Sequence, residues 1–139
     1  MKWLLDTNAV SELSKPAPAV ELVNWLAANE SDTALSAVTI GEIVGGVERL
    51  PEGKKRRRLE RALRFLREDY ADRILDFTEG AAVEWGRLVA EASKQGRKLS
   101  VLDSQIEATA IYYGLIVATR NGEDFFHPVL DPWEQPPLL

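Results

Sequence analysis

Residues 3–10 read WLLDTNAV, an apolar run that ends abruptly at an aspartate. Trp3, Leu4 and Leu5 are typical of a short buried strand, and Asp6 follows where that strand would end. A carboxylate in such a place costs desolvation free energy unless a charge or a hydrogen bond meets it. The stretch therefore predicts a strand whose carboxyl end carries an acid with a structural or chemical task.

Outward from this strand, short apolar runs alternate with segments of helical periodicity. The strand-like runs cover 2–5, 33–37, 73–77 and 115–119, and the helical segments cover 9–14, 18–29, 40–50, 54–70, 79–95 and 103–113. Parallel strands need long crossover connections, which the intervening helices supply. We predict an α/β fold with a central, mainly parallel sheet and helices on both faces, formed by a single domain over residues 1–139. The last stretch, LDPWEQPPLL, is expected to be a terminal tail.

The composition limits the chemistry available to this chain. Of its 139 residues, 45% are hydrophobic and 28% are charged, as in an ordinary folded domain. Without cysteine and with His127 as the one histidine, disulfides, thiolate sites and zinc sites built from several imidazoles are excluded. No serine or acid stands at triad spacing around His127, so we expect a structural role for it. Catalysis must then use carboxylates, hydroxyls, amides, lysines or arginines.

Neither a membrane span nor an export signal is visible in the sequence. No apolar run approaches the ~20 residues that a transmembrane helix needs. The apolar stretch at the N-terminus is too short and too acidic for a secretory signal. We expect a cytoplasmic protein that does not associate with membranes.

The formal net charge of −5 argues at first against a nucleic-acid partner, since phosphate binding is normally driven by an excess of Lys and Arg. The distribution of charge matters more than the sum. Residues 54–68 read KKRRRLERALRFLRE, so positive charge is concentrated on one helical segment. This segment keeps nucleic-acid binding open. The alternative is a solvated helix laced with intrahelical pairs such as Arg64 and Glu68.

Four carboxylates stand at strand ends or in first helical turns: Asp6, Glu42, Asp103 and Asp124. In a parallel sheet such positions converge on the crevice at the carboxyl ends of the strands. Four carboxylates packed together repel one another unless a cation joins them. Mg²⁺ or Mn²⁺ would resolve the conflict, because hard divalent ions prefer oxygen ligands. The pattern predicts an acidic, metal-binding pocket.

Each of these acids also has a simple structural explanation. Thr39-x-x-Glu42 and Ser100-x-x-Asp103 both fit a helix capping box, in which the acid satisfies backbone donors at the helix start. Asp6 could cap the helix at 9–14, and Asp124 could be an ordinary turn acid. These explanations account for the residues one at a time and leave their convergence unexplained.

Four segments together resemble the PIN-domain ribonucleases, and within them the VapC toxins, especially the FitB-like branch. They are LLDTNAVSEL, LSAVTIGEIVGGVERLPEGKKRRRLE, LDSQIEATAIYYGLIVATRNGEDF and LDPW, which in order span almost the whole chain. The resemblance implies a three-layer α/β/α PIN fold. It also implies an endoribonuclease that depends on Mg²⁺, with Mn²⁺ as a substitute, and that is the toxin of a type II (VapBC) toxin–antitoxin system. Such toxins are typically homodimers inhibited by a cognate antitoxin protein.

Carried over position by position, the acidic quartet of the family falls on the four carboxylates already identified. Asp6 and Asp103 are the expected metal ligands. Glu42 and Asp124 are expected to act through water or by positioning the nucleophile. The reaction implied is hydrolysis of RNA phosphodiester bonds by an activated water. Arg56, Arg57, Arg58 and Arg61 are the candidate RNA-binding residues.

Polar neighbours of the quartet also match. Thr119 and Asn121 occupy the positions beside the fourth acid, and Asn8 follows Asp6; each is expected to hold a carboxylate or water in place. Glu107 departs from the family pattern, where a small residue is common. It lies one helical turn after Asp103, so it would add a fifth carboxylate at the pocket edge or face solvent.

Three other functions fit parts of the pattern. A PIN scaffold without catalytic activity could serve in a regulatory or DNA-binding complex with a partner protein. A phosphatase of the haloacid-dehalogenase type would need an aspartate where Asn8 stands. A receiver-like phosphoacceptor domain would place a lysine beyond the final strand, where Thr119 is followed by Arg120 and Asn121.

Overall fold

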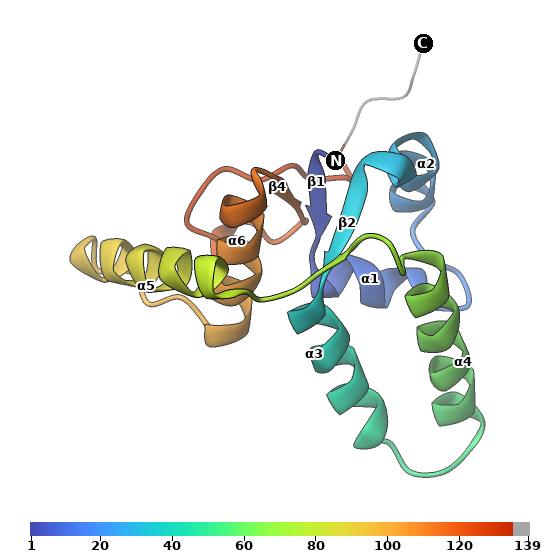
Figure 1. The fold of residues 1–139 in the computed structure, drawn as a ribbon. Helices are drawn as coiled ribbons and strands as arrows, with labels where there is room; N and C mark the ends of the chain where they lie inside the picture. Colours follow the sequence, from blue (N-terminus) through green and yellow to red (C-terminus); the bar gives the residue numbers. More distant parts are fainter. Residues whose placement is uncertain (135–139) are drawn as a thin grey trace.

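Four parallel strands form the centre of the molecule. The structure, a computed structural model, describes residues 1–134. The strands are β1 (Trp3–Leu5), β2 (Thr33–Ser36), β3 (Ile74–Leu75) and β4 (Ile116–Ala118), in the sheet order β3-β2-β1-β4 (Figure 1). All three pairings are parallel, as the alternating sequence pattern predicted. The four predicted strand-like runs are confirmed, each within a few residues.

Helices connect the strands at the predicted places. They are α1 (Thr7–Leu13), α2 (Val20–Asn29), α3 (Ala37–Glu48), α4 (Lys54–Asp69), α5 (Glu79–Lys94) and α6 (Val101–Tyr113). Two 3₁₀ turns, η1 (Glu30–Asp32) and η2 (Gly122–Asp124), precede β2 and follow β4. Thr78 caps α5 by accepting a hydrogen bond from Ala81 N at 3.1 Å. None of the helices within residues 1–134 combines the length and apolar character needed to cross a bilayer.

The sheet is covered on both faces, which makes the fold a three-layer α/β/α sandwich. Successive strand residues point to opposite faces. Leu5 and Leu35 therefore pack with α1, α2 and the end of α4, whereas Leu4 and Ala34 pack with α6. In Figure 1, α5 lies outside α6, and α3 and α4 extend side by side from the carboxyl edge of the sheet. The core thus holds β1 rigidly and places its carboxyl end at the crevice.

The C-terminal stretch differs in part from the predicted tail. Leu130 forms a parallel bridge with Ala118, donating its N–H to Val117 O at 3.0 Å and accepting from Thr119 N at 2.8 Å. Pro132 is fully buried, and the Arg120 guanidinium lies 4.9 Å from the ring centre of Trp133. Leu130 therefore extends the sheet edge by one bridge, and Pro132 and Trp133 pack after it. The rest of the predicted tail, 135–139, lies outside the described residues.

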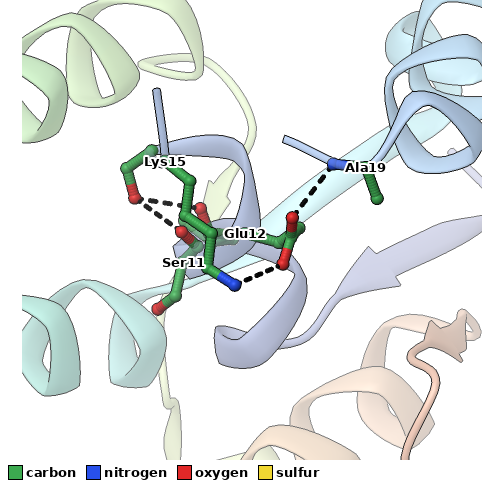
Figure 2. Close-up of polar contacts among 6 residues, drawn as sticks. Ser11, Glu12, Lys15 and Ala19 are labelled. Carbon is green, nitrogen blue, oxygen red and sulfur yellow. Dashed lines mark hydrogen bonds and ion pairs between the residues drawn. The ribbon is translucent and has the colours of Figure 1, made fainter. Parts of the chain in front are cut away.

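The connection from α1 to α2 depends on one carboxylate. Glu12 accepts hydrogen bonds from Ala19 N at 2.9 Å and from Lys15 Nζ at 2.8 Å (Figure 2). Ala19 is the N-cap residue of α2 and provides no side-chain cap, so Glu12 satisfies a backbone donor that would otherwise lack a partner at the helix start. The pKa of Glu12 is lowered chiefly by the hydrogen bond from Lys15. Glu12 thus fixes the entry angle of α2.

We expect Glu12→Ala to lower the thermal unfolding midpoint at pH 7, because the Ala19 amide loses its acceptor. Glu12→Gln keeps an acceptor and should lose less. The pKa of Glu12 is lowered in the folded state, so Glu12 stabilises the fold at neutral pH. This stabilisation is lost as the pH falls below the ordinary pKa of a glutamate and through the lowered pKa of Glu12. Circular dichroism melts of the two variants provide the measurement. Equal midpoints for both variants and the unsubstituted protein would contradict this account.

Candidate functional site

Asp6 ends β1 and begins α1. Its side chain is 2% exposed, and each of its oxygens has a protein partner. Oδ1 accepts from Ala9 N at 2.9 Å, which confirms the capping explanation for this acid. Oδ2 accepts from the hydroxyl of Thr119 at 2.6 Å, across 113 residues of sequence. The capping explanation is therefore right and incomplete, because Asp6 also joins β1 to the end of β4.

The electrostatics of Asp6 show which other acids lie near it. Burial raises the pKa of Asp6 to about 6, against the opposing effect of the hydrogen bonds from Thr119 and Ala9. The negative charges of Asp103 and Glu42 raise it further. Three carboxylates separated by up to 97 positions in the sequence therefore act on one another at the carboxyl edge of the sheet.

Glu42 is held by a hydroxyl rather than by a helix cap. The hydroxyl of Thr7 donates to Glu42 Oε1 at 2.8 Å and lies 3.1 Å from the buried hydroxyl of Thr39. The N-cap of α3 is Ser36, whose side chain accepts from Val38 N at 3.0 Å. Thr39 thus lies inside the helix, and the proposed Thr39–Glu42 capping box is wrong. Glu42 is left facing α1 from the second turn of α3.

Asp103 lies between the other acids. Its backbone N–H donates to the hydroxyl of Ser100, the N-cap of α6, at 3.2 Å. Within residues 1–134 its carboxylate does not return a bond to the Ser100 amide, so the capping box is half formed. Asp124, exposed at the end of η2, has a pKa raised by partial burial and by the charges of Asp103 and Glu123. The charge of Asp103 therefore acts on both Asp6 and Asp124.

The acids converge without forming a tight cage. In the described part of the chain, no three of the residue types Asp, Glu and His are close enough to ligate one ion together. The donor set is nonetheless entirely carboxylate, and the repulsion felt by Asp6 is the kind that a divalent cation relieves. Because Mg²⁺ keeps several waters and uses one or two carboxylates, a pair such as Asp6 and Asp103 fits it.

The polar neighbours lie only partly where the sequence placed them. Thr119 is fully buried against Asp6 and also accepts from Asn121 N at 3.0 Å. Asn121 contributes through its backbone, since its carbonyl accepts from Asp124 N at 3.0 Å. Asn8 is exposed and makes no hydrogen bond to Asp6 among residues 1–134. Thr7 supports the site instead, through Glu42, a contact across 35 residues that only the fold reveals.

Glu107 is neither solvated nor an edge ligand. It is 3% exposed, and its two oxygens accept from Phe126 N and His127 N, each at 2.8 Å. His127 Nδ1 lies 2.8 Å from the same carboxylate, consistent with the predicted structural role of this histidine. From the other side, Arg97 Nη2 donates to Glu123 O and Phe125 O at 3.0 Å each. Glu107 and Arg97 together clamp the loop that presents Asp124.

The four candidate RNA-binding arginines divide into two groups. Arg56 is bound to Leu50 O and paired with Glu48, Glu52 and Glu60 at 2.9–3.6 Å, and Arg58 donates to Ser14 O at 3.2 Å. These two tie α4 to its surroundings in the uncomplexed chain, and their role in RNA binding stays a prediction. Arg57 and Arg61 are exposed and remain candidates. The alternative pair, Arg64 and Glu68, does not form an ion pair in the described chain.

An apolar groove of about 690 Å³ adjoins the acidic site. It runs between α4 and the surface made by α1, α3 and the end of α2. Glu42 and Asn8 lie in its wall, and its apolar lining includes Val10, Leu13, Leu26, Ile43, Leu59, Leu63, Phe65 and Leu66. The ring of Phe65 is 71% exposed on this wall. The apolar face of α4 thus lines the groove, and none of the residues of α4 is fully buried.

Comparisons with known proteins agree with this geometry. A PIN domain sequence profile matches residues 3–128. The chain is 38% identical to the toxin FitB of Neisseria gonorrhoeae over 138 residues, covering 94% of this chain and 97% of the relative. It is 35% identical to the VapC ribonuclease Y4jK of Sinorhizobium fredii over 136 residues, again covering 94% and 97%.

Solved structures of toxin–antitoxin proteins are also similar to this chain. The crystal structure of FitAcB from Neisseria gonorrhoeae matches with a TM-score of 0.87 at 36% identity, covering 96% of this chain and 99% of that chain. A toxin–antitoxin complex from Klebsiella pneumoniae matches with a TM-score of 0.70 at 25% identity, covering 96% and 100%. The predicted three-layer α/β/α fold is confirmed.

The raised pKa of Asp6 predicts how stability depends on pH without divalent metal. Between pH 4 and 6 the unfolded chain ionises Asp6 while the folded chain keeps it protonated, so the free energy of unfolding should fall as the pH rises. The contribution is on the order of 3 kcal/mol. Asp6→Asn keeps the Oδ1 cap and should remove this part of the dependence. Denaturant unfolding of both proteins in EDTA measures it, and parallel pH profiles would contradict it.

Glu107→Gln should loosen the Asp124 loop, because one carbonyl oxygen cannot replace two carboxylate acceptors. We expect a loss of about 1–3 kcal/mol in unfolding free energy and faster hydrogen exchange at the Phe126 and His127 amides. Glu123→Gln, on the same loop and exposed, is the matched control. If exchange at these amides is unchanged in Glu107→Gln, Glu107 does not hold the loop.

Proposed function

The chain belongs to the PIN-domain family, and we propose that it is a divalent-metal-dependent endoribonuclease, the toxin of a toxin–antitoxin pair. The observation that carries the proposal is the electrostatic contact of Asp103 with both Asp6 and Asp124, while Glu42 also acts on Asp6. Relatives that carry the names VapC ribonuclease and toxin FitB over nearly the whole chain support the same activity.

Asp6 and Asp103 are the residues that would hold a Mg²⁺ ion. When bound, the ion lowers the pKa of a water molecule and offsets charge that develops on the phosphate. The protein's part is positioning. Thr119 and the Ala9 amide fix the Asp6 carboxylate, and Thr7 fixes Glu42. Asp6 is therefore aimed before substrate arrives, so little reorganisation is needed during reaction.

Asp124 and Glu42 are suited to handle protons and water. The pKa of Asp124 is raised, so its carboxylate is a better proton acceptor than an ordinary aspartate. We assign it the proton released as water attacks phosphorus and the bond to the leaving ribose oxygen breaks. The loop clamp of Glu107 and Arg97 keeps Asp124 beside Asp103. Glu42, held by the hydroxyl of Thr7, is the acid that we assign to orienting the water.

The other functions considered from the sequence receive less support. A phosphoacceptor or haloacid-dehalogenase role needs Asp6 as a nucleophile, yet both of its oxygens already accept hydrogen bonds and its pKa is raised. A PIN scaffold without catalysis would not require Thr7 and Thr119 to aim two carboxylates at one crevice. Neither alternative is favoured by a contact in residues 1–134.

Partner binding is the second part of the proposal. Structures similar to this chain include a toxin–antitoxin complex, which supports a cognate antitoxin here. The apolar groove is the surface we assign to it, because the groove exposes Phe65 and leads to Glu42. A homodimer is also proposed: Val83, Leu102 and Tyr112 are 41–48% exposed on α5 and α6, away from the groove.

The enzyme is tested by incubating the purified chain with a panel of structured and single-stranded RNAs, with Mg²⁺ or with EDTA. We expect cleavage with Mg²⁺ only, and a loss of at least ~100-fold in Asp6→Asn and Asp103→Asn, because each removes a charge that the ion requires. Glu91→Gln, an exposed acid on α5, is the matched control and should cleave normally. Asp103→Asn that is folded by circular dichroism and fully active would contradict the proposed site.

A further inference from the structure

The end of the groove remote from the acidic site carries a second pair of carboxylates. Glu30 in η1 and Asp69, the last residue of α4, share a side-chain hydrogen bond and both line the groove. Glu30 precedes β2, at the amino edge of the sheet, whereas α3 with Glu42 follows β2 at the carboxyl edge. The groove therefore has acids at both ends and an apolar floor between them.

A buried hydroxyl at the same end lacks a well-formed hydrogen bond. Tyr70 is 2% exposed and lines the groove; among residues 1–134 its hydroxyl makes no hydrogen bond of ordinary geometry, and only a poorly aligned contact from the Arg73 side chain reaches it. An unpaired buried hydroxyl lowers the stability of a fold, so its retention needs a reason. A ligand that brings a hydrogen-bond donor or acceptor to this end of the groove would supply one.

The local charge balance indicates a cation. The charge of Arg73 acts on Glu30 and lowers its pKa in part, but the guanidinium is engaged elsewhere: it lies 4.6 Å from the Tyr70 ring centre, and its nitrogens bond Thr33 O at 3.1 Å and Asp72 at 3.3 Å. No ion pair within 4 Å joins Arg73 to Glu30 or Asp69 in the described chain. The pKa of Glu30 is raised, first by its hydrogen bond to Asp69. An incoming cation would relieve the repulsion between the two acids.

The same features favour a protein segment over RNA. Phosphates would be repelled by acids at both ends of the groove, whereas a peptide can bury apolar side chains on Leu59, Leu63 and Phe65. An amphipathic helix in an apolar groove is a common recognition mode. Such a segment would carry its apolar residues along the floor and a basic residue at the end over α2.

We propose that Glu30, Asp69 and the Tyr70 hydroxyl form a specificity subsite for a Lys or Arg side chain of the antitoxin segment that occupies the groove. This inference rests on the proposed function, because it assigns part of the proposed partner's surface. The subsite selects the partner by charge at a point separated from the reacting centre by the length of β2. The subsite also fixes the direction in which the segment binds, because its basic residue must lie at the end of the groove that carries the two acids. An apolar segment without a cation would leave these acids unpaired.

The probe for the test is a set of 16-residue peptides selected from a random display library on the full-length chain. Counter-selection uses Gly46→Trp, because Gly46 lines the groove and a side chain there enters open space. Gly86→Trp on α5, where space is also open, is the matched control for added bulk. We expect groove-dependent peptides that combine apolar residues at helical spacing with a Lys or Arg near one end.

The decisive step is a double-mutant cycle. Replacing the peptide's Lys or Arg by norleucine should weaken binding to the unsubstituted chain about tenfold, but less than about twofold in the Glu30→Gln/Asp69→Asn variant. The control variant Glu21→Gln/Glu68→Gln removes the same charge from α2 and α4 outside the groove and should keep the full effect. Equal effects in both double variants, or groove-dependent peptides that lack a cation, would overturn the subsite.

Tyr70→Phe tests the hydroxyl separately. The uncomplexed protein should keep or gain stability, because the deleted hydroxyl makes no well-formed hydrogen bond, while binding of the selected peptide should fall about threefold. A loss of stability with unchanged binding would make the hydroxyl structural and exclude it from the subsite.

RNA cleavage by the unsubstituted chain is measured in the same preparation. If the chain cleaves RNA but the double-mutant cycle shows no coupling between the peptide cation and the Glu30–Asp69 pair, only the subsite is overturned. An absence of cleavage overturns the proposed enzyme whatever the peptides show.

Discussion

The site depends on one buried contact, the hydrogen bonds that hold the Asp6 carboxylate at the end of β1. The Ala9 amide donates a hydrogen bond to one oxygen and the Thr119 hydroxyl to the other. The same carboxylate therefore caps α1 and connects β1 to the end of β4. These bonds do not fully offset burial and the charges of Asp103 and Glu42, since the pKa of Asp6 stays near 6. The fold therefore fixes the orientation of the Asp6 carboxylate but does not fully compensate its negative charge.

Other acids of the site are also held in place by contacts from neighbouring elements. Thr7 holds Glu42 from α1, and Glu107 with Arg97 holds the loop of Asp124 from α6 and from the segment after α5. Asp6 and Glu42 are each held by a hydroxyl from another element, and Asp124 is held through its loop, so these contacts oppose the repulsion among the acids. The apolar groove begins at Glu42, which places a partner-binding surface directly against the reacting centre.

Within residues 1–134 the sequence predicted the order and type of the four strands and six α-helices, because short apolar runs alternate with segments of helical periodicity. It also predicted that Asp6, Glu42, Asp103 and Asp124 approach one crevice. Of the neighbours that support them it predicted Thr119 and missed the others. Thr39 looked like a helix cap but lies inside α3, and Asn8 looked adjacent to Asp6 but faces outward. The contacts of Thr7 and Glu107 join residues 20 to 35 positions apart, so they exist only in the folded chain.

If the four carboxylates form one site whose charge a divalent cation completes, binding of that cation must stabilise the folded chain. The most direct measurement is the change in unfolding free energy with Mg²⁺ concentration at pH 7, for the unsubstituted chain and for Asp103→Asn. A bound ion stabilises the folded state in proportion to its occupancy. The account predicts a rise with Mg²⁺ in the unsubstituted chain and little or none in Asp103→Asn. The same response in both proteins, or no response in either, would contradict it.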